Sequence, residues 1–221
     1  SLAQTFVTLD HLSEGRAILG IGNGLRENTE PYGLPSRMRV ARLEEALEVL
    51  ALLFASEGKP LDYAGRYYKL DGAVFDLPLW EGRPPPVYIG SHAPRMLGLT
   101  GRYGDGWLPG QPVDAEEYAR RLQVIHAAGE EAGRSMKNFM ATQTMLLVLG
   151  DDRDAVITQA MQSLYVAYNT LGLAGSVWRK HGLDHPMGDD FAGQIELVPA
   201  ATPRELVEAA MVRMTPELLL E

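Results

Sequence analysis

Glycine and asparagine gather directly behind the first short apolar segment of the chain. The stretch GIGNGLRENTEPYG, residues 20–33, contains four glycines, two asparagines and one proline, and it overlaps the end of the apolar run RAILGIG. Gly22 and Gly24 would allow positive φ or close approach to a flat ligand, and the amides of Asn23 and Asn28 could bind polar ring edges. The composition fits a ligand-contacting loop and a merely flexible loop equally well.

A second chemically interesting stretch is IGSHAPRM, in which a strand ends and a helix begins at once. Backbone N–H groups at a helix start, together with the helix dipole, favour an anion. Gly90 would let the backbone approach a phosphate, Ser91 offers a hydroxyl, and His92 could donate from either ring nitrogen, with Ala93 leading into the helix. The alternative is a tight turn in which Ser91 only caps the helix.

The remaining polar residues give weaker signals. Asp105, in GRYGDGW, precedes a strand, which places it at the opposite rim from the chemistry and favours a turn-forming role, while Trp107 is a candidate core residue. His185, Asp189 and Asp190 could bind a metal, but two histidines at ligand spacing on one element are missing, so we predict no metal site. The chain has no Walker A loop, no G-x-G-x-x-G spacing and no G-x-S-x-G elbow.

Composition narrows the class of protein. The 221 residues are 46% hydrophobic and 22% charged, with no cysteine and a net charge of −9. The absence of cysteine removes disulfides and thiolate chemistry and fits a cytoplasmic location. Because the 20 basic residues form no stripe, binding to nucleic acid is not expected. Neither a secretory signal nor an apolar run long enough to span a membrane is present, so we expect no membrane association.

The elements that must position these residues alternate between strand and helix. Such a pattern predicts an α/β protein with a parallel sheet, as either a (β/α)₈ barrel or an open doubly wound sheet. The expected strands are 16–22, 87–90, one ending near 108, and 139–150. The expected helices are 2–12, 37–55, 91–103 with Pro94 near its start, 114–133, 151–171 and 202–214, and residues 61–75 are expected to form a β-hairpin or two extended arms.

Four such units cannot close an eight-stranded barrel. The helical start and the apolar end of the chain therefore suggest one barrel domain, residues 1–221, truncated at both ends. Residues 172–201 are rich in Gly, Pro and Asp and are expected to form an irregular insertion. Exposed sheet edges would favour a homodimer.

Several segments, in this order, resemble the bacterial luciferase-like superfamily: TLDHLSEGRAILGIGNG, RVARLEEALEVL, YYKLDGAVF and PPVYIGSHAPRMLGLTGRYGDGW. The similarity is closest to its coenzyme F420-dependent oxidoreductases. HGLDHPMGDDFAGQIELVP and PELLLE resemble, more narrowly, phthiodiolone ketoreductases and methylenetetrahydromethanopterin reductases. The resemblance covers essentially the whole chain and implies units four to seven of an incomplete (β/α)₈ TIM barrel.

The resemblance also implies which residues hold the coenzyme. Asn28 matches a residue near the deazaflavin ring, where Gly22 and Asn23 would also lie. The loop that holds the coenzyme phosphate would contain Gly90, Ser91, His92 and Ala93, with Trp107 and Leu108 beside it. Where some members carry an acidic residue directly after G-x-G, this chain has Leu25, with Glu27 close by. No residue is assigned a catalytic role, because the protonating histidine of such enzymes would precede Ser1.

The implied chemistry is hydride transfer between coenzyme F420 and a small organic substrate. Two alternatives stay open at this point: an FMN-dependent monooxygenase of the same superfamily, and a non-catalytic barrel fragment without a coenzyme. All of these interpretations require the segments around residues 22–28 and 90–93 to lie at the same end of the sheet.

Overall fold

The fold was obtained as a computed structural model, which describes residues 1–25, 29–35, 37–110, 115–144, 149–163, 166, 175–180, 182–185 and 204. The chain divides into two compact units, Ser1–Thr144 and Met145–Glu221. Asn28, Glu27, Ser36 and Asp114 lie outside the described residues, as does most of the predicted helix at 202–214 and of the predicted insertion at 172–201.

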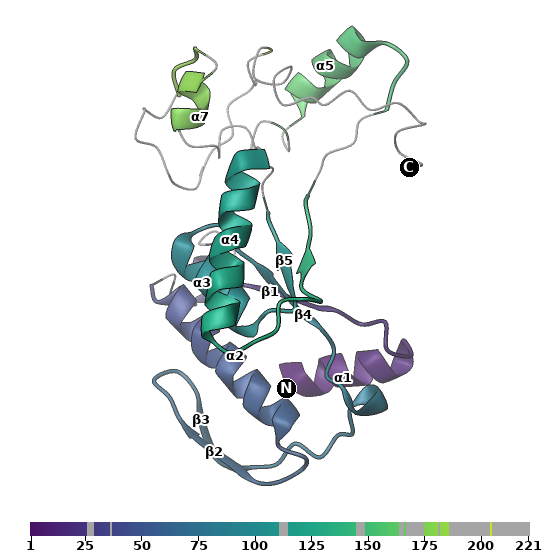
Figure 1. Cartoon of the computed structure of the whole chain (residues 1–221), viewed down its shortest axis with the longest axis vertical. Helices are drawn as coiled ribbons and strands as arrows, with labels where there is room; N and C mark the ends of the chain where they lie inside the picture. Colours follow the sequence, from purple (N-terminus) through teal and green to yellow (C-terminus); the bar gives the residue numbers. More distant parts are fainter. Residues whose placement is uncertain are drawn as a thin grey trace. The chain divides into compact units, whose positions relative to one another are not determined.

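In the described part of the first unit, four strands form a parallel sheet in the order β1-β4-β5-β6. Helices follow these strands in turn along the chain (Figure 1). The strands are β1 (Leu19–Gly22), β4 (Val87–Gly90), β5 (Gly106–Leu108) and β6 (Met140–Ala141); the intervening helices are α2 (Arg39–Ala55), α3 (Pro94–Tyr103) and α4 (Ala115–Glu131).

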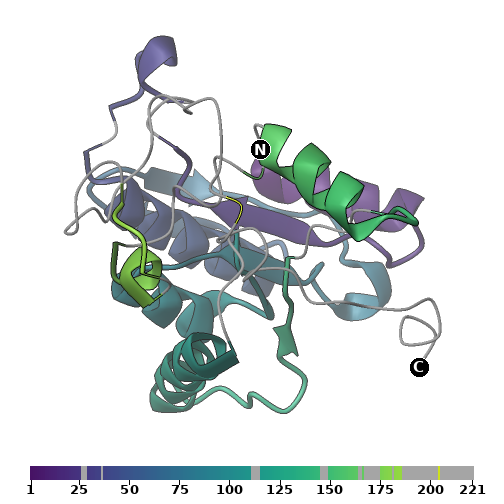
Figure 2. The same ribbon diagram turned by 90° about the horizontal axis from the view of Figure 1, so that it is seen from above.

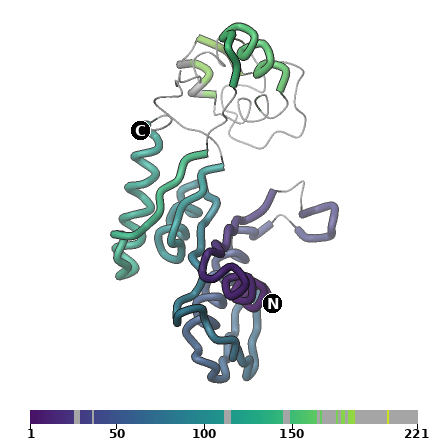
Figure 3. Tube along the Cα trace, turned by 90° about the vertical axis from the view of Figure 1, so that its right-hand side faces the viewer, coloured from purple at the N-terminus to yellow at the C-terminus, as the bar shows by residue number. Residues whose placement is uncertain are grey.

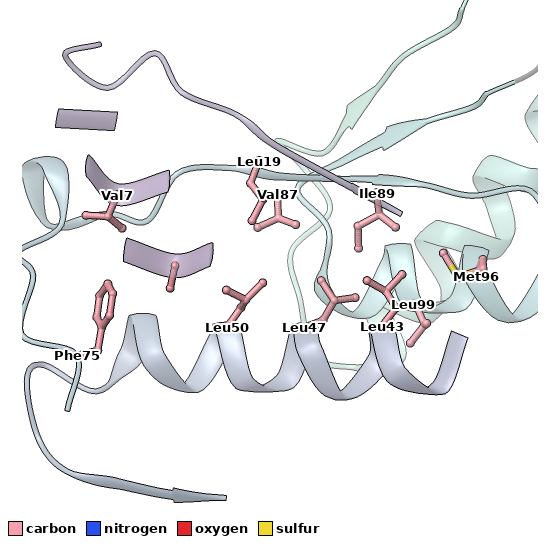
Figure 4. Packing of buried hydrophobic residues seen from close by; sticks show 11 residues of the cluster. Val7, Leu19, Leu43, Leu47, Leu50, Phe75, Val87, Ile89, Met96 and Leu99 are labelled. Carbon is pink, nitrogen blue, oxygen red and sulfur yellow. The ribbon is translucent and has the colours of Figure 1, made fainter. Parts of the chain in front are cut away.

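The apolar side chains of the strands face these helices. Figure 4 shows Leu19, Val87 and Ile89 pointing toward Leu43 and Leu47 of α2. Farther along the sheet, a second cluster joins Trp107 of β5 to Leu97 of α3 and Ile125 of α4, and all three side chains are buried. A helical stripe of apolar residues thus covers each pair of strands.

This arrangement decides between the two predicted architectures. Ile21, Ile89 and Trp107 are register partners on neighbouring strands, so the helices that cover them lie on one face of the sheet. A doubly wound sheet has helices on both faces and a reversal of strand order. Neither occurs in the described sheet. Its strands lie in the order of the sequence, and α2 lies along one face (Figure 2). The fold is therefore that of consecutive units of a (β/α) barrel.

Two further elements complete the first unit. The predicted extended arms form an antiparallel hairpin of β2 (Leu61–Ala64) and β3 (Lys69–Ala73). Its turn is tied to α2 because the Glu45 carboxylate accepts hydrogen bonds from the backbone N–H groups of Arg66, Tyr67 and Tyr68 at 3.0, 2.7 and 3.2 Å. The N-terminal helix α1 (Leu2–Leu12), dark purple in Figure 3, contacts the short 3₁₀ helix η3 (Trp80–Gly82).

Element boundaries differ from the predictions mainly at the ends. The first strand begins at Leu19 and not at Arg16. The backbone N–H of Ala17 donates a hydrogen bond to the Asp10 side chain at 3.2 Å, so this N–H is not available for pairing in the sheet. The last strand is short: only Met140–Ala141 pair with β5, whereas residues 145–148 lie outside the described part. Of the long helix predicted at 151–171, α5 (Arg153–Gln162) is described.

In the second unit, α5 is capped by the Asp152 side chain, which accepts from the backbone N–H groups of Asp154 and Ala155. A short helix, α7 (Gly175–Lys180), follows in the sequence. Trp178 of this helix is buried, and its ring lies 5.0 Å from that of His185, centroid to centroid.

Candidate functional site

The chain segments that follow β1, β4 and β5 meet at one end of the sheet, the end at which these strands have their carboxyl termini. Gly22 is the register partner of Gly90, and Gly90 is the partner of Leu108. Because the strands are parallel, the residues that follow them must emerge at the same end. The condition set by the sequence, that the segments after residues 22 and 90 lie side by side, is met for the described residues of both loops.

Near this end, the sheet face opposite the helices is lined by glycine. Side chains alternate between the two faces of the sheet along a strand. The face opposite the Leu19 and Ile89 side chains therefore carries four glycines, Gly20, Gly22, Gly90 and Gly106. A Cβ atom on Gly22 would meet its nearest heavy atom, the Gly90 carbonyl oxygen, at 3.8 Å. We call this surface the glycine face; among the described residues it presents bare backbone at Gly22 and Gly90.

The glycine face also carries side chains, those of Tyr88, Leu108 and, next to Gly106 on β6, Met140. The ring of Tyr88 covers Gly106, where an added Cβ would come within 2.7 Å of it. Leu108 reaches over β4 toward Gly20, where an added Cβ would lie 3.7 Å from its Cδ1 atom. The predicted site residue Leu108 therefore belongs to this face.

Trp107, which the resemblance also assigns to the site, points the other way. Its side chain is completely buried among the helices, and its indole N–H donates a hydrogen bond to the Ser91 carbonyl oxygen at 3.0 Å. Through this hydrogen bond, Trp107 holds the backbone of the loop after β4 from the helix side of the sheet. Its contact with the predicted site is to the protein backbone.

Ser91 and Ala93 make different contributions to the loop after β4. The Ser91 side chain is buried, and its hydroxyl is hydrogen-bonded to that of Thr100 at 2.8 Å, so it joins the loop to α3. Ala93 is the N-cap residue of α3 and has no polar side chain with which to cap it, and Pro94 occupies the first helical position. No side chain among the described residues therefore caps the N–H groups of Arg95 and Met96.

His92 is held between two hydrogen-bond donors. The backbone N–H of Gly110, after β5, points at Nε2 across 3.0 Å, and Nη1 of Arg121, on α4, lies 3.1 Å from Nδ1. Burial, and then the charge of Arg121, lower the pKa of His92. The ring is therefore neutral near pH 7 and carries a single proton.

Arg121 is itself anchored by a carboxylate on the same helix. Its Nε donates to Oε1 of Glu117 at 2.6 Å, and its side chain is only 17% exposed. Hydrogen bonds from Arg120, and then from Arg121, hold the pKa of Glu117 down at about 2. Sequence reasoning missed Arg121, because one arginine on the polar face of a helix carries no local signal.

The loop after β1 is described only up to Leu25. Gly24 has a φ of +70° and its carbonyl oxygen accepts a hydrogen bond from Arg39 at 2.7 Å, so the start of α2 holds the loop. Asn23 is half-buried, next to Gly22, and Leu25 is 39% exposed. The predicted ring contact of Asn28 lies outside the described residues.

Asp105 lies at the opposite end of β5 from the site. Its carboxylate accepts from the Val87 backbone N–H at 3.0 Å and from Arg134 at 2.9 Å. The side chain closes the start of the strand, as its position before β5 predicted. Among the described residues no group of three metal-ligating side chains occurs, and no described helix is long and apolar enough to cross a membrane.

Comparison with known proteins identifies the family. A sequence profile described as luciferase-like monooxygenase matches residues 1–217. The chain belongs to the luciferase-like family. Family members therefore provide the context in which the glycine face and the His92 loop can be interpreted.

Two curated relatives come from Mycobacterium tuberculosis. A phthiodiolone/phenolphthiodiolone dimycocerosates ketoreductase is 38% identical over 219 residues, which is 99% of this chain and 57% of that protein. An F420-dependent hydroxymycolic acid dehydrogenase is 33% identical over 160 residues, covering 70% of this chain and 42% of that protein. This luciferase-like chain thus spans little more than half the length of the ketoreductase.

Solved structures of similar proteins support the fold. The coenzyme F420-dependent tetrahydromethanopterin reductase from Methanopyrus kandleri superposes with a TM-score of 0.70 at 26% identity, covering 85% of this chain and 56% of that one. An F420-dependent secondary alcohol dehydrogenase, in complex with an F420-acetone adduct, has the same fold at a TM-score of 0.62 and 22% identity. The family and the barrel fold predicted from the sequence are confirmed.

Proposed function

We propose that this luciferase-like chain binds coenzyme F420 and belongs to an oxidoreductase that transfers a hydride between F420 and a small organic substrate. The observation that carries the proposal is the juxtaposition of the glycine face with the donors of the His92 loop. Relatives whose names include F420 support the choice of coenzyme.

The residues present suit the two chemically different parts of such a coenzyme. A flat ring requires backbone without side chains in the way, and the glycine face offers Gly22 and Gly90 at the strand ends, with Asn23 next to them. A phosphate requires N–H donors, which the start of α3 would supply. Burial of Trp107 and Ser91 keeps these backbone groups in place.

In the mechanism we propose, the chain supplies binding, orientation and exclusion of water. Bound F420 would supply the hydride chemistry at its deazaflavin ring. Gly22 and Gly90 would let the ring lie against the sheet, and Asn23 and Asn28 would bind its polar edge. His92, Ala93 and the backbone of Ser91 would hold the phosphate, with Leu108 filling the remaining space on the glycine face. Holding ring and substrate face to face lowers the entropic cost of the transfer.

Quenching of F420 fluorescence during titration with the purified chain tests this proposal. We expect binding in the micromolar range and about tenfold weaker binding for Gly90→Ala, since a methyl group on the glycine face would cost about 1.4 kcal/mol of ring contact. The substitution leaves the fold intact, because the new Cβ would meet its nearest atom, the Ile21 carbonyl oxygen, at 3.7 Å.

Gly98→Ala, on α3, is the matched control and should bind F420 normally. Binding of FMN in place of F420 would favour a flavin-dependent monooxygenase, and binding of neither would favour a non-catalytic fragment. Equal affinities of the wild type and Gly90→Ala would contradict the assignment of the glycine face. A cytoplasmic location and a homodimer stay predictions.

A further inference from the structure

The His92 ring faces more hydrogen-bond donors than a neutral imidazole can accept from, and the proposed function does not explain this. Both ring nitrogens face donors: the Gly110 N–H at Nε2 and the Arg121 guanidinium at Nδ1. A guanidinium has five N–H groups and no acceptor, and a backbone N–H is likewise only a donor. A neutral imidazole has one lone pair and one N–H, so it can accept from only one of these partners.

The two donors differ in how firmly they are held. Arg121 is mostly buried and bonded to Glu117 at 2.6 Å, whereas Gly110 is exposed. The permanent charge of Arg121 also makes its hydrogen bond to the ring the stronger of the two. Nδ1 should therefore be the nitrogen that accepts, and the single proton of the neutral ring should sit on Nε2.

With the proton on Nε2, two N–H groups converge. The Nε2–H of His92 and the N–H of Gly110 then point at each other across 3.0 Å, which is repulsive. An oxygen that accepts from both, with the two N–H groups turned aside toward it, would relieve this repulsion. An added Cβ on Gly110 would itself lie only 3.0 Å from Nε2, so a side chain at this position would crowd such an oxygen.

We propose that Arg121 is a positioning residue that sets the tautomer of His92, so that Nε2–H and the Gly110 N–H together bind one oxygen of a phosphate group. The inference rests on the proposed function for the identity of that phosphate as part of the coenzyme. Arg121 acts through the imidazole, and no contact of its own with the ligand is required. The neutral ring supplies a donor without taking up a proton.

Nitrogen-15 NMR of the labelled chain, without ligand, tests the tautomer directly. The chain has five histidines, and loss of one signal in His92→Gln assigns the ring. At pH 7.5 we expect the Nε2–H form in the wild type and a shift toward the Nδ1–H form in Arg121→Gln. Arg120→Gln is the matched control, because Arg120 bonds the same Glu117 at 2.6 Å and is 59% exposed.

The second measurement titrates inorganic phosphate and follows the His92 signals. We expect about tenfold weaker binding for Arg121→Gln, the effect of losing the Nε2–H donor to the phosphate, and unchanged binding for Arg120→Gln. In the His92→Gln background, whose amide also offers a donor, Arg121→Gln should have little further effect. If Arg121→Gln does not fold, Glu117→Gln removes the ion pair that anchors Arg121 and should raise the Nδ1–H population.

A wild-type ring in the Nδ1–H form would overturn the inference, as would an unchanged tautomer in a folded Arg121→Gln protein. Equal phosphate affinity of Arg121→Gln and Arg120→Gln would also overturn it. Failure of F420 to bind while phosphate still shifts the His92 signals would refute the proposed function and leave the role of Arg121 standing.

Discussion

Substitution of Gly101 by alanine should destabilise the protein, because α3 and α4 touch through this residue. An added Cβ at Gly101 would lie 2.2 Å from the Ile125 carbonyl oxygen and 2.8 Å from the Gly129 backbone nitrogen. Both neighbours are helix backbone, which cannot turn aside as a side chain can. The helices would have to move apart by about 1 Å to reach ordinary contact distance.

The cost follows from two opposing terms. Overpacking of a tight contact costs about 1–3 kcal/mol. Alanine loses less backbone entropy than glycine when the helix forms, and this returns about 1 kcal/mol. The upper part of the overpacking range applies here, because the contact is between backbones, so the net loss should be about 2 kcal/mol. For a chain of this size that lowers Tm by about 4–8 °C.

Thermal and urea unfolding of Gly101→Ala and Gly98→Ala provide the assay. Gly98 lies on the same helix, but among the described residues an added Cβ would have no neighbour within 4 Å. Gly98→Ala should therefore be as stable as the wild type, or more stable by up to about 1 kcal/mol. If both variants melt within about 1 °C of the wild type, the helices do not cross as closely as described, and the placement of Arg121 by α4 would lose its support.

Two further predictions concern the loop after β4. Trp107→Phe removes the donor to the buried Ser91 carbonyl and should lower the free energy of unfolding by about 1–3 kcal/mol, measured in urea; a loss below about 0.5 kcal/mol would contradict this role. Because burial and the Arg121 charge lower the pKa of His92 from 6.5, the unfolded chain binds the proton more tightly, and stability should fall as pH drops below 6.5. Urea unfolding should show a smaller loss between pH 7 and pH 5 in His92→Gln, and an unchanged slope would disprove the linkage.

The sequence alone predicted the order of strands and helices and the end of the sheet at which the strands' following segments meet. The apolar run before Gly22, the run VYIG and the proline that opens α3 are local signals, since each depends on the intrinsic preferences of neighbouring residues. They predicted β4 with the bounds that the structure shows, Val87–Gly90, and they predicted the end of α3 at Tyr103, whereas the helix was expected from Ser91 and begins at Pro94. Parallel strands then require the segments after Gly22 and Gly90 to be neighbours, which the register confirms.

Tertiary structure alone decided which way the side chains point and which distant groups they meet. The Trp107 side chain points toward the helices, which agrees with its position as a candidate core residue, and the Ser91 hydroxyl is bound by Thr100; the family resemblance implied that both lie beside the coenzyme phosphate. Arg121 approaches His92 across 29 positions of the chain. No local pattern encodes that contact, because it depends on how closely α3 and α4 pack, and two glycines set that distance only after the helices have met.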